Sequence, residues 1–599
     1  MEGPKAPKDP TKKRKSFYIM RGKSVAGSPQ ADGRGVQFLY MNDGRMISSA
    51  RLVGGITDEE MLKLLETAAG FRQLVHSVGV TVEAQDRELV TDFCLQMYGH
   101  RDVYGSGTTL RMPVQANGME HILELEDCDW SEDDNVPGQI RFEFPQAGTL
   151  ATVAVRLYLQ DGFDAPEAEE EDPVDFTSPY YRQMLKKSLV QTGNNARLKR
   201  AMEKARGGED VTIAFIGGSI TQGAGAIPIN TECYAYKTFK GFCELAGRGT
   251  EENVHYVKAG VGGTPSELGM IRYERDVLRE GSVAPDVVVV EFAVNDEGDE
   301  TKGECYDSLV RKILSAENHP AVILLFAVFA NDFNLQERLS PVGRAYNLPM
   351  VSARDTVLEQ FYQKPGSGRV VSKNQFFYDS YHPTNVGHTV MADGILHLLR
   401  TVDGQEADAD TLKLEEIAPP IGGAFEKVQL LDRRHFAGRM ALDGDGAVLQ
   451  GGSAAESGAG SGQETEPPVM IDCGSFAHVD MELQAVEMDL DLTGTPEFAD
   501  NWMYRGTEKA EGCRPFVMDI TCTGLLLVYK DSASNQTGCA EVWVDGEKAL
   551  YADPHVNGWT HCNAQICFRD RERKSYHVEV KMAPGMEDKD FTILGFGVV

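Results

Sequence analysis

The hydrophobic residues of the chain follow different patterns in successive regions. Between about residues 16 and 160, apolar and polar positions alternate in short segments separated by Gly, Asn and Asp. Clear examples lie at residues 78–85, 108–115, 121–130 and 139–145. This two-residue period predicts short β-strands, and several such strands are typical of a sandwich. A stretch with helical periodicity at residues 58–75 predicts one interrupting helix.

From about residue 176 to 405 the apolar positions form continuous runs. These runs occupy residues 211–218, 287–294 and 321–330. Stretches with a helical period, such as 267–280 and 385–400, are placed among them. Apolar strands that alternate with amphipathic helices predict an α/β domain whose parallel sheet is buried on both faces. Ligands of such sheets bind at the carboxyl ends of the strands, so the residues just after each run deserve the closest inspection.

After residue 405 the pattern becomes β-like again. Segments 516–530, 540–551, 575–582 and 591–599 predict strands of a second sandwich. Residues 161–175 hold eight acidic side chains and no basic one, which is typical of a solvated linker. A Gly/Ser/Glu-rich stretch at 451–468 predicts a loop. We therefore expect the following domains: an N-terminal β-sandwich (1–160), a linker (161–175), an α/β domain (176–405) and a C-terminal β-sandwich (406–599).

Charge and composition limit the partners of the protein. The formal net charge is −32, so the surface repels nucleic acid and anionic membranes, whereas a small neutral molecule such as a sugar meets no such repulsion. The N-terminus carries no apolar segment of the length that a secretory signal needs, which favours a cytoplasmic location. The eleven cysteines include no CxxC pair and are expected to be reduced thiols. We expect neither a metal nor an organic cofactor, and a homo-oligomer stays open.

Candidate chemistry gathers where the apolar runs end. The first run leads through two glycines into Ser219, an arrangement that can present a hydroxyl at the sheet edge beside exposed amides. A strand–helix turn without chemistry is the alternative, and a phosphate loop is disfavoured because the P-loop and GxGxxG spacings are absent. A second glycine-rich turn contains Gly260, Gly262 and Gly263. One of their amides can serve an oxyanion hole, although each glycine alone is equally explained as a turn former.

Two further motifs complete the set. Asn295 follows the run at 287–294, and its amide either donates into a cleft or caps the next turn. His382 stands three residues after Asp379, so the imidazole can take a proton from a serine while the carboxylate orients it. A DxxH spacing alone also occurs by chance. His388 and His255 have no carboxylate at a matching spacing, and we interpret both as structural.

Taken together, these motifs resemble the four blocks of the SGNH/GDSL hydrolase superfamily, over roughly residues 205–400. The resemblance implies a flavodoxin-like three-layer domain, with Ser219 as nucleophile, His382 as general base and acid, and Asp379 as its orienting partner. It also implies an oxyanion hole of the Ser219 amide, the Asn295 side chain and a glycine, for which Gly263 fits the family spacing best. Three blocks depart from the family pattern: Gly218 replaces the Asp of GDS, Ala293 replaces the Gly of GxND, and Lys258 stands where many members have Asn.

The GGSIT, GVGGT and EFAVND variants are similar to bacterial carbohydrate acetylesterases flanked by β-sandwich domains. This similarity implies a serine esterase that deacetylates short oligosaccharides. An SGNH lipase or thioesterase acting on longer acyl esters and a non-catalytic glycan-binding protein are the alternatives. Four aromatic or imidazole side chains of the flanking regions are either a sugar platform or core residues: Trp130, Trp502, Trp559 and His561.

Overall fold

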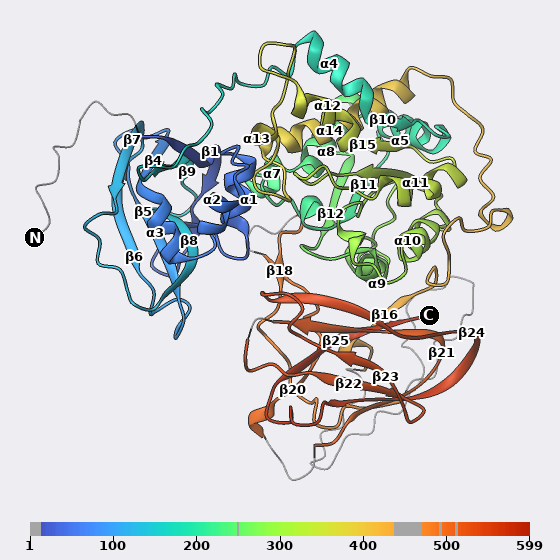
Figure 1. Cartoon of the computed structure of the whole chain (residues 1–599). Coiled ribbons are helices and arrows are strands. Elements are labelled where there is room, and N and C mark those ends of the chain that lie inside the picture. Colours follow the sequence, from blue (N-terminus) through green and yellow to red (C-terminus); the bar gives the residue numbers. More distant parts are fainter. Residues whose placement is uncertain (1–13, 248–250, 437–469, 490–493, 509–512, 533) are drawn as a thin grey trace, which may run out of the picture.

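The computed structural model describes residues 14–247, 251–436, 470–489, 494–508, 513–532 and 534–599. The predicted loop at 451–468 lies outside these ranges. Three regions follow one another along the chain, two of them rich in β-structure and the middle one built of a sheet covered by helices (Figure 1). Within the described ranges, no helix combines the length and apolarity needed to cross a bilayer.

The N-terminal region contains two antiparallel sheets that enclose a shared hydrophobic core. One sheet has the order β1-β9-β4-β7 and the other the order β2-β3-β8-β5-β6. The strands are β1 (Ser16–Ala26), β2 (Ser28–Pro29), β3 (Gly35–Tyr40), β4 (Val75–Ala84), β5 (Val90–Gly99), β6 (Thr109–Gln115), β7 (Asn117–Glu124), β8 (Asp134–Phe144) and β9 (Leu150–Leu159). The alternating pattern therefore predicted this sandwich correctly.

The helices of this region differ from the prediction. The single helix expected over 58–75 is divided into α2 (Glu59–Leu64) and α3 (Ala68–Leu74). The division has a local cause, because the Thr67 side chain accepts a hydrogen bond from the Gly70 amide and so begins a new helix. An additional helix, α1 (Arg45–Leu52), was not predicted from the sequence.

The middle region holds a six-stranded sheet of order β10-β15-β14-β13-β11-β12, parallel except for the β10–β15 pair. The strands are β10 (Leu189–Gln191), β11 (Val211–Gly217), β12 (Val254–Gly260), β13 (Val287–Glu291), β14 (Ala321–Phe326) and β15 (Met350–Ser352). The helices are α4 (Pro179–Leu185), α5 (Ala196–Gly207), α6 (Ser219–Gln222), α7 (Ile229–Glu232), α8 (Tyr234–Leu245), α9 (Ser266–Asp276), α10 (Glu304–Leu314), α11 (Gln336–Ala345), α12 (Ala353–Tyr362), α13 (Lys373–Phe376) and α14 (Asn385–Asp403).

The two faces of this sheet are both buried. Along β11, Ile213 and Phe215 pack into a core with α5, α8 and α14, whereas Ala214 and Ile216 pack into a second core with α9, α10 and α11. A strand covered on both faces needs apolar residues at every position, which explains the continuous runs of the sequence. The predicted flavodoxin-like domain is thereby confirmed.

The C-terminal region is built on an eight-stranded antiparallel sheet. Its main path is β16-β25-β21-β24-β22-β23, with β17 paired to β21 and β20 to β25, and β18 and β19 form a separate ribbon. The strands are β16 (Gln429–Leu431), β17 (Met470–Asp472), β18 (Ala485–Val486), β19 (Thr495–Pro496), β20 (Trp502–Tyr504), β21 (Phe516–Asp531), β22 (Ala540–Val544), β23 (Glu547–Ala552), β24 (His561–Met582) and β25 (Phe591–Val598). A second β-rich region thus flanks the α/β domain, as the sequence pattern predicted.

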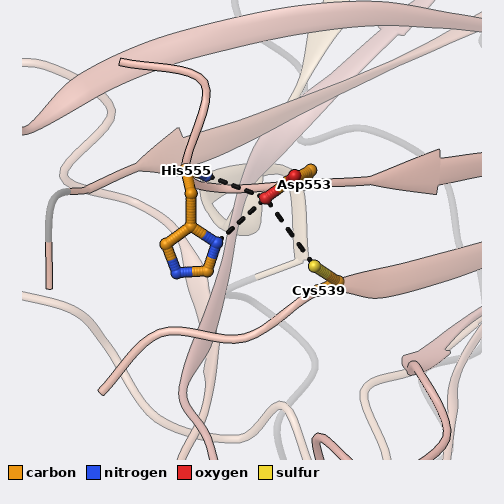
Figure 2. A group of neighbouring side chains, drawn as sticks. All are labelled: Cys539, Asp553 and His555. Carbon is orange, nitrogen blue, oxygen red and sulfur yellow. Dashed lines mark hydrogen bonds and ion pairs between the residues drawn. The ribbon is translucent and has the colours of Figure 1, made fainter. Parts of the chain in front are cut away.

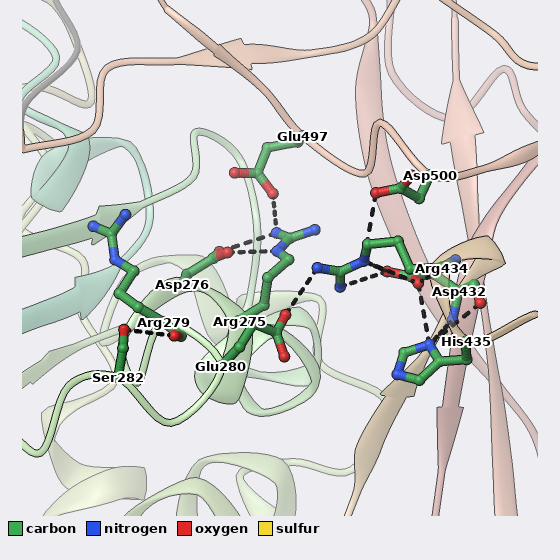
Figure 3. A network of polar contacts seen from close by, with 10 residues as sticks. All are labelled: Arg275, Asp276, Arg279, Glu280, Ser282, Asp432, Arg434, His435, Glu497 and Asp500. Atoms are coloured by element: carbon green, nitrogen blue, oxygen red, sulfur yellow. Dashed lines mark hydrogen bonds and ion pairs between the residues drawn. The ribbon is translucent and has the colours of Figure 1, made fainter. Parts of the chain in front are cut away.

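Both flanking regions contact the middle region directly. The linker at 161–175 has no regular structure and is mostly exposed, but Glu169 pairs with Arg369 (3.0 Å) and Glu171 accepts from the Asn374 side chain (2.7 Å). On the other side, Arg275 of α9 forms an ion pair with the buried Glu497 of the C-terminal region (Figure 3). The α/β domain is therefore contacted on two sides by the segments that flank it.

Candidate active site

The structure brings Ser219, His382 and Asp379 together in one hydrogen-bonded chain. Ser219 begins α6 immediately after β11 and Gly218. The distance between His382 Nε2 and Ser219 Oγ is 3.0 Å. On its other side, His382 Nδ1 lies 2.8 Å from Asp379 Oδ2. A hydroxyl, an imidazole and a carboxylate in this order can activate the hydroxyl as a nucleophile.

A short hairpin turn between α13 and α14 carries Asp379 and His382. It is closed by a bridge between Phe377 and Pro383 and by the Tyr378 amide, which donates to the His382 carbonyl (2.8 Å). Asp379 Oδ1 accepts from the His382 amide at 2.8 Å as well as facing its imidazole. The same carboxylate therefore folds the turn and orients the ring, which explains why the two residues stand three positions apart.

Burial and charge set the protonation of this pair in opposite directions. Burial by itself would raise the pKa of Asp379, but the neighbouring His382 and two backbone amides hold that pKa below its ordinary value. Burial also disfavours the imidazolium of His382, yet Asp379 outweighs it and the pKa of His382 lies above its ordinary value. The carboxylate is thus ionised, and the imidazole gains a proton more readily than a free histidine.

Asn295 lies against the peptide that precedes Ser219. A Cβ placed on Gly218 would stand 2.3 Å from Asn295 Oδ1 and 2.8 Å from Nδ2, so only a glycine lets the amide approach this closely. Asn295 begins a 3-10 helix (Asn295–Glu297) just after β13. The asparagine and the serine, 76 positions apart in the sequence, are neighbours at the carboxyl ends of adjacent strands.

The three candidate glycines occupy different environments. Gly260 is paired with Gly217 in the sheet, and the Gly262 amide donates to Gln222 Oε1 (3.0 Å). Gly263 has a φ of +74°, in the left-handed region that glycine tolerates best. The Gly262 amide is therefore already engaged within the turn, and the choice of Gly263 as the oxyanion glycine still rests on the family spacing.

The other two histidines serve structural contacts. His388 is buried, accepts from the Tyr234 amide (3.2 Å) and contacts the Ala224 carbonyl (3.1 Å). Burial lowers its pKa to about 3, so the ring stays neutral. His255 lies on the surface with Nε2 3.0 Å from Asp210. Neither ring faces Ser219 through any described contact, in agreement with the sequence interpretation.

Sequence reasoning missed a buried carboxyl behind Ser219. Glu291 ends β13, is fully buried, and accepts from Thr221 Oγ1 at 3.1 Å. Thr221 also lies 2.8 Å from the Tyr234 hydroxyl. Burial raises the pKa of Glu291 to about 7, although Thr221 and the Gly218 amide oppose the shift. The signal was present, because Glu291 is the charged residue inside the apolar run VVVVEFAV.

The C-terminal region reaches the glycine turn of the site. Gln484 Nε2 donates to the Gly262 carbonyl at 2.8 Å. A Cβ on Gly263 would stand 2.7 Å from His561 Nε2 and 2.9 Å from Trp559 Cζ2, and the Trp559 side chain is 43% exposed. By contrast, Trp502 is 1% exposed and belongs to the core, and Trp130 lies beneath the Arg72 guanidinium. Of the four residues named from sequence, only Trp559 and His561 lie at the site.

Among the residues that the structure describes, two groups of side chains have donor sets suited to a metal ion. Cys539, Asp553 and His555 meet near the surface of the C-terminal region (Figure 2), and Glu267, Asp299 and Cys305 meet in the interior of the middle region. In the first group, His555 Nδ1 (2.9 Å) and Cys539 Sγ (3.7 Å) both contact the same Asp553 oxygen. These atoms already satisfy one another, so the arrangement is explained without an ion. We assign no metal to either group.

Comparison with known proteins places the middle region in a family. Residues 215–390 match the model of the GDSL-like Lipase/Acylhydrolase family. A crystal structure of "a two-domain esterase (CEX) active on acetylated mannans" is 24% identical, covers 69% of this chain and 98% of its own, and superposes with a TM-score of 0.53. The same esterase co-crystallized with mannopentaose gives 25% identity, the same coverage and a TM-score of 0.52. No curated protein matches the chain by sequence. The α/β domain that carries Ser219, Asn295, Asp379 and His382 is a GDSL-like lipase/acylhydrolase domain.

Proposed function

We propose that the protein is a serine esterase that removes O-acetyl groups from short oligosaccharides. The observation that carries the proposal is the hydrogen-bonded chain from Ser219 through His382 to Asp379. This chain stands at the carboxyl ends of the parallel strands, where α/β sheets bind their ligands. The match to a lipase/acylhydrolase family supports ester hydrolysis as the reaction class.

The proposed reaction is acyl transfer in two steps. Ser219 attacks the ester carbonyl while His382 Nε2 takes the hydroxyl proton, and Asp379 stabilises the imidazolium. The tetrahedral oxyanion is held by the amides of Ser219 and Gly263 and by the Asn295 side chain. His382 then protonates the leaving alcohol. Water, deprotonated by the same imidazole, attacks the acyl-serine, and acetate leaves as Ser219 regains its proton.

Three observations support an acetylated sugar as the substrate. A structurally similar esterase is described as active on acetylated mannans. The half-exposed Trp559 ring at the glycine turn offers an apolar face of the kind that sugar rings stack on. The net charge of −32 disfavours anionic lipid surfaces. For the cytoplasmic location expected above, the proposed substrates are imported oligosaccharides and not intact polymers.

Acetate release across a panel of acetylated oligosaccharides, together with nitrophenyl esters of increasing acyl length, tests the proposal. We expect acetyl esters to be strongly preferred over octanoyl esters, because each methylene that finds no apolar contact forgoes about 0.8 kcal/mol. Ser219→Ala is expected to retain the fold and to lower kcat by at least about 10³-fold. A kcat/KM that rises steadily from acetate to octanoate would indicate a lipase or thioesterase instead. Glycan binding without any hydrolysis would indicate a binding protein.

A further inference from the structure

A lysine of the N-terminal region is buried beneath the turn that carries Asp379 and His382. Lys23 belongs to β1, and only 1% of its surface is exposed. Its ammonium donates to the Phe377 carbonyl at 2.6 Å and also to the Asn374 carbonyl. A buried ammonium is costly unless it is hydrogen-bonded, so this side chain is committed to these two backbone groups.

The strand is irregular at the point where it delivers this side chain. The pairing of β1 with β9 shifts register between Met20 and Lys23. Gly22, between them, has a φ of +61°. Such a bulge re-aims the following side chain, and here it directs Lys23 out of the sandwich and into the hydrolase domain.

The two carbonyls lie at the base of the catalytic turn. Asn374 belongs to α13, whose last carbonyls have no partner within the helix, and a cation at a helix C-terminus satisfies such groups. Phe377 forms the bridge with Pro383 that closes the turn. The next residue, Tyr378, packs against the hydrophobic core of the N-terminal sandwich. The N-terminal region therefore contacts the turn and its base at two backbone carbonyls and at the Tyr378 side chain.

The charges around Lys23 are arranged to favour its cationic form. Burial lowers the pKa of Lys23 to about 7, and the carboxylates of Glu171 and Asp379 oppose that shift. Glu171 comes from the acidic linker and accepts from the Asn374 side chain at 2.7 Å. The linker is thus part of the same contact.

We propose that Lys23 is a positioning residue, which holds the 377–383 turn in place so that His382 stays within reach of Ser219. The inference rests on the proposed esterase function, and it gives the N-terminal sandwich a part in catalysis. A shift of about 1 Å in a catalytic group can cost as much as about 100-fold in rate. Replacement of Lys23 therefore lowers kcat while leaving the binding of a small ester largely unchanged.

The test uses the full chain and a small substrate, nitrophenyl acetate. Lys23→Met removes the ammonium at similar volume, and we expect kcat to fall by about 10- to 100-fold with KM changed less than about threefold. Lys23→Arg, which retains charge and donors, should recover part of the loss. In a His382→Ala background, Lys23→Met should have less than about a twofold further effect, because there is no imidazole left to position. Equal losses in both backgrounds, or an unchanged kcat, would overturn the proposal.

A second pair of variants covers the case in which Lys23→Met does not fold. Gly22→Ala strains the bulge, and Gly33→Ala imposes the same kind of strain (φ +84°) in the same domain, with open space around both positions. Only Gly22→Ala should lower kcat. Hydrogen exchange at the amides of Tyr378 and Thr384, which are bonded within the turn, should accelerate in Gly22→Ala and not in Gly33→Ala. Exchange is independent of turnover, so an inactive wild-type protein would refute the esterase proposal while the exchange rates still decide the role of Lys23.

Discussion

The N-terminal and C-terminal regions contact the hydrolase domain at different halves of the same site. The N-terminal sandwich holds the base half, where Lys23 binds the backbone below Asp379 and His382. The C-terminal region meets the oxyanion half, where Gln484 binds the Gly262 carbonyl and Trp559 stands beside Gly263. The first contact is buried, whereas the second includes an exposed aromatic ring. The two β-rich regions thus contact different parts of the proposed catalytic machinery.

The difference also appears in how each region is fastened. Lys23 reaches backbone carbonyls, which no substitution in the hydrolase domain can remove. The C-terminal region makes one such backbone contact, through Gln484, and is otherwise fastened by side-chain ion pairs around α9, including Arg275 with Glu497 and Arg434 with Glu280 (Figure 3). We infer that the Lys23 contact fixes the geometry of the catalytic turn. The contacts of the C-terminal region affect the stability of the protein and the access of substrate to the site. The following predictions test that distinction.

The base half should show the largest effect on rate. We expect His382→Ala to lower kcat by at least about 10³-fold. The loss of kcat in Asp379→Asn should be about 10- to 100-fold smaller than that in His382→Ala, since the imidazole remains but loses its orienting partner. Because catalysis requires neutral His382, activity should fall as the pH drops through a pKa above the ordinary histidine value. Asp379→Asn removes the interaction that raises this pKa, so the acid limb should move to lower pH. The pH dependence of kcat/KM measures both shifts, and an unchanged limb in Asp379→Asn would contradict the assignment.

The ion pairs around α9 should affect stability and not rate. The partly buried Arg275 contacts two buried carboxylates, Asp276 (2.5 Å) and Glu497, so Arg275→Met leaves Glu497 buried without this partner and should cost about 3–5 kcal/mol. Glu280→Gln breaks an exposed pair at the same interface and should cost at most about 1 kcal/mol. Urea titration followed by tryptophan fluorescence measures the difference, because three of the four tryptophans lie in the C-terminal region. Equal midpoints for the two variants would show that the buried pair contributes no more than the exposed one.

Patterns local in the sequence predicted most of the fold. The continuous run at 211–218 became β11, and the alternating segment at 78–85 became part of β4. The break in the helix expected at 58–75 was not predicted, because the apolar period continues through Thr67. The break is caused by a single hydrogen bond, which the Thr67 hydroxyl accepts at the start of α3. The period of a pattern identifies an element more reliably than it locates its ends.

The site could be predicted only as far as its residues form motifs. Ser219, Asp379 and His382 stand next to strand ends or within one turn, and the structure brings them into contact. Lys23 and Gln484 gave no signal, since each acts across more than 200 positions of sequence on a backbone carbonyl. A contact of that kind depends on how the domains pack against one another. Neither the residue type nor the spacing in the sequence predicts that packing.

The smallest effect we predict is at Trp559, and it distinguishes substrate access from geometry. If the exposed ring binds a sugar of the acetylated oligosaccharide, Trp559→Ala should lower kcat/KM on that substrate about tenfold, which corresponds to about 1.4 kcal/mol of lost contact. On nitrophenyl acetate, which has no sugar to stack, the same variant should change kcat/KM less than about twofold, and Trp559→Phe should retain most of the activity on both substrates. Trp543→Ala provides the matched control, because Trp543 lies in the same region beneath Lys581 (4.0 Å). An equal loss on both esters would mean that Trp559 supports the Gly263 turn and so acts on geometry, as Lys23 does on the other half of the site.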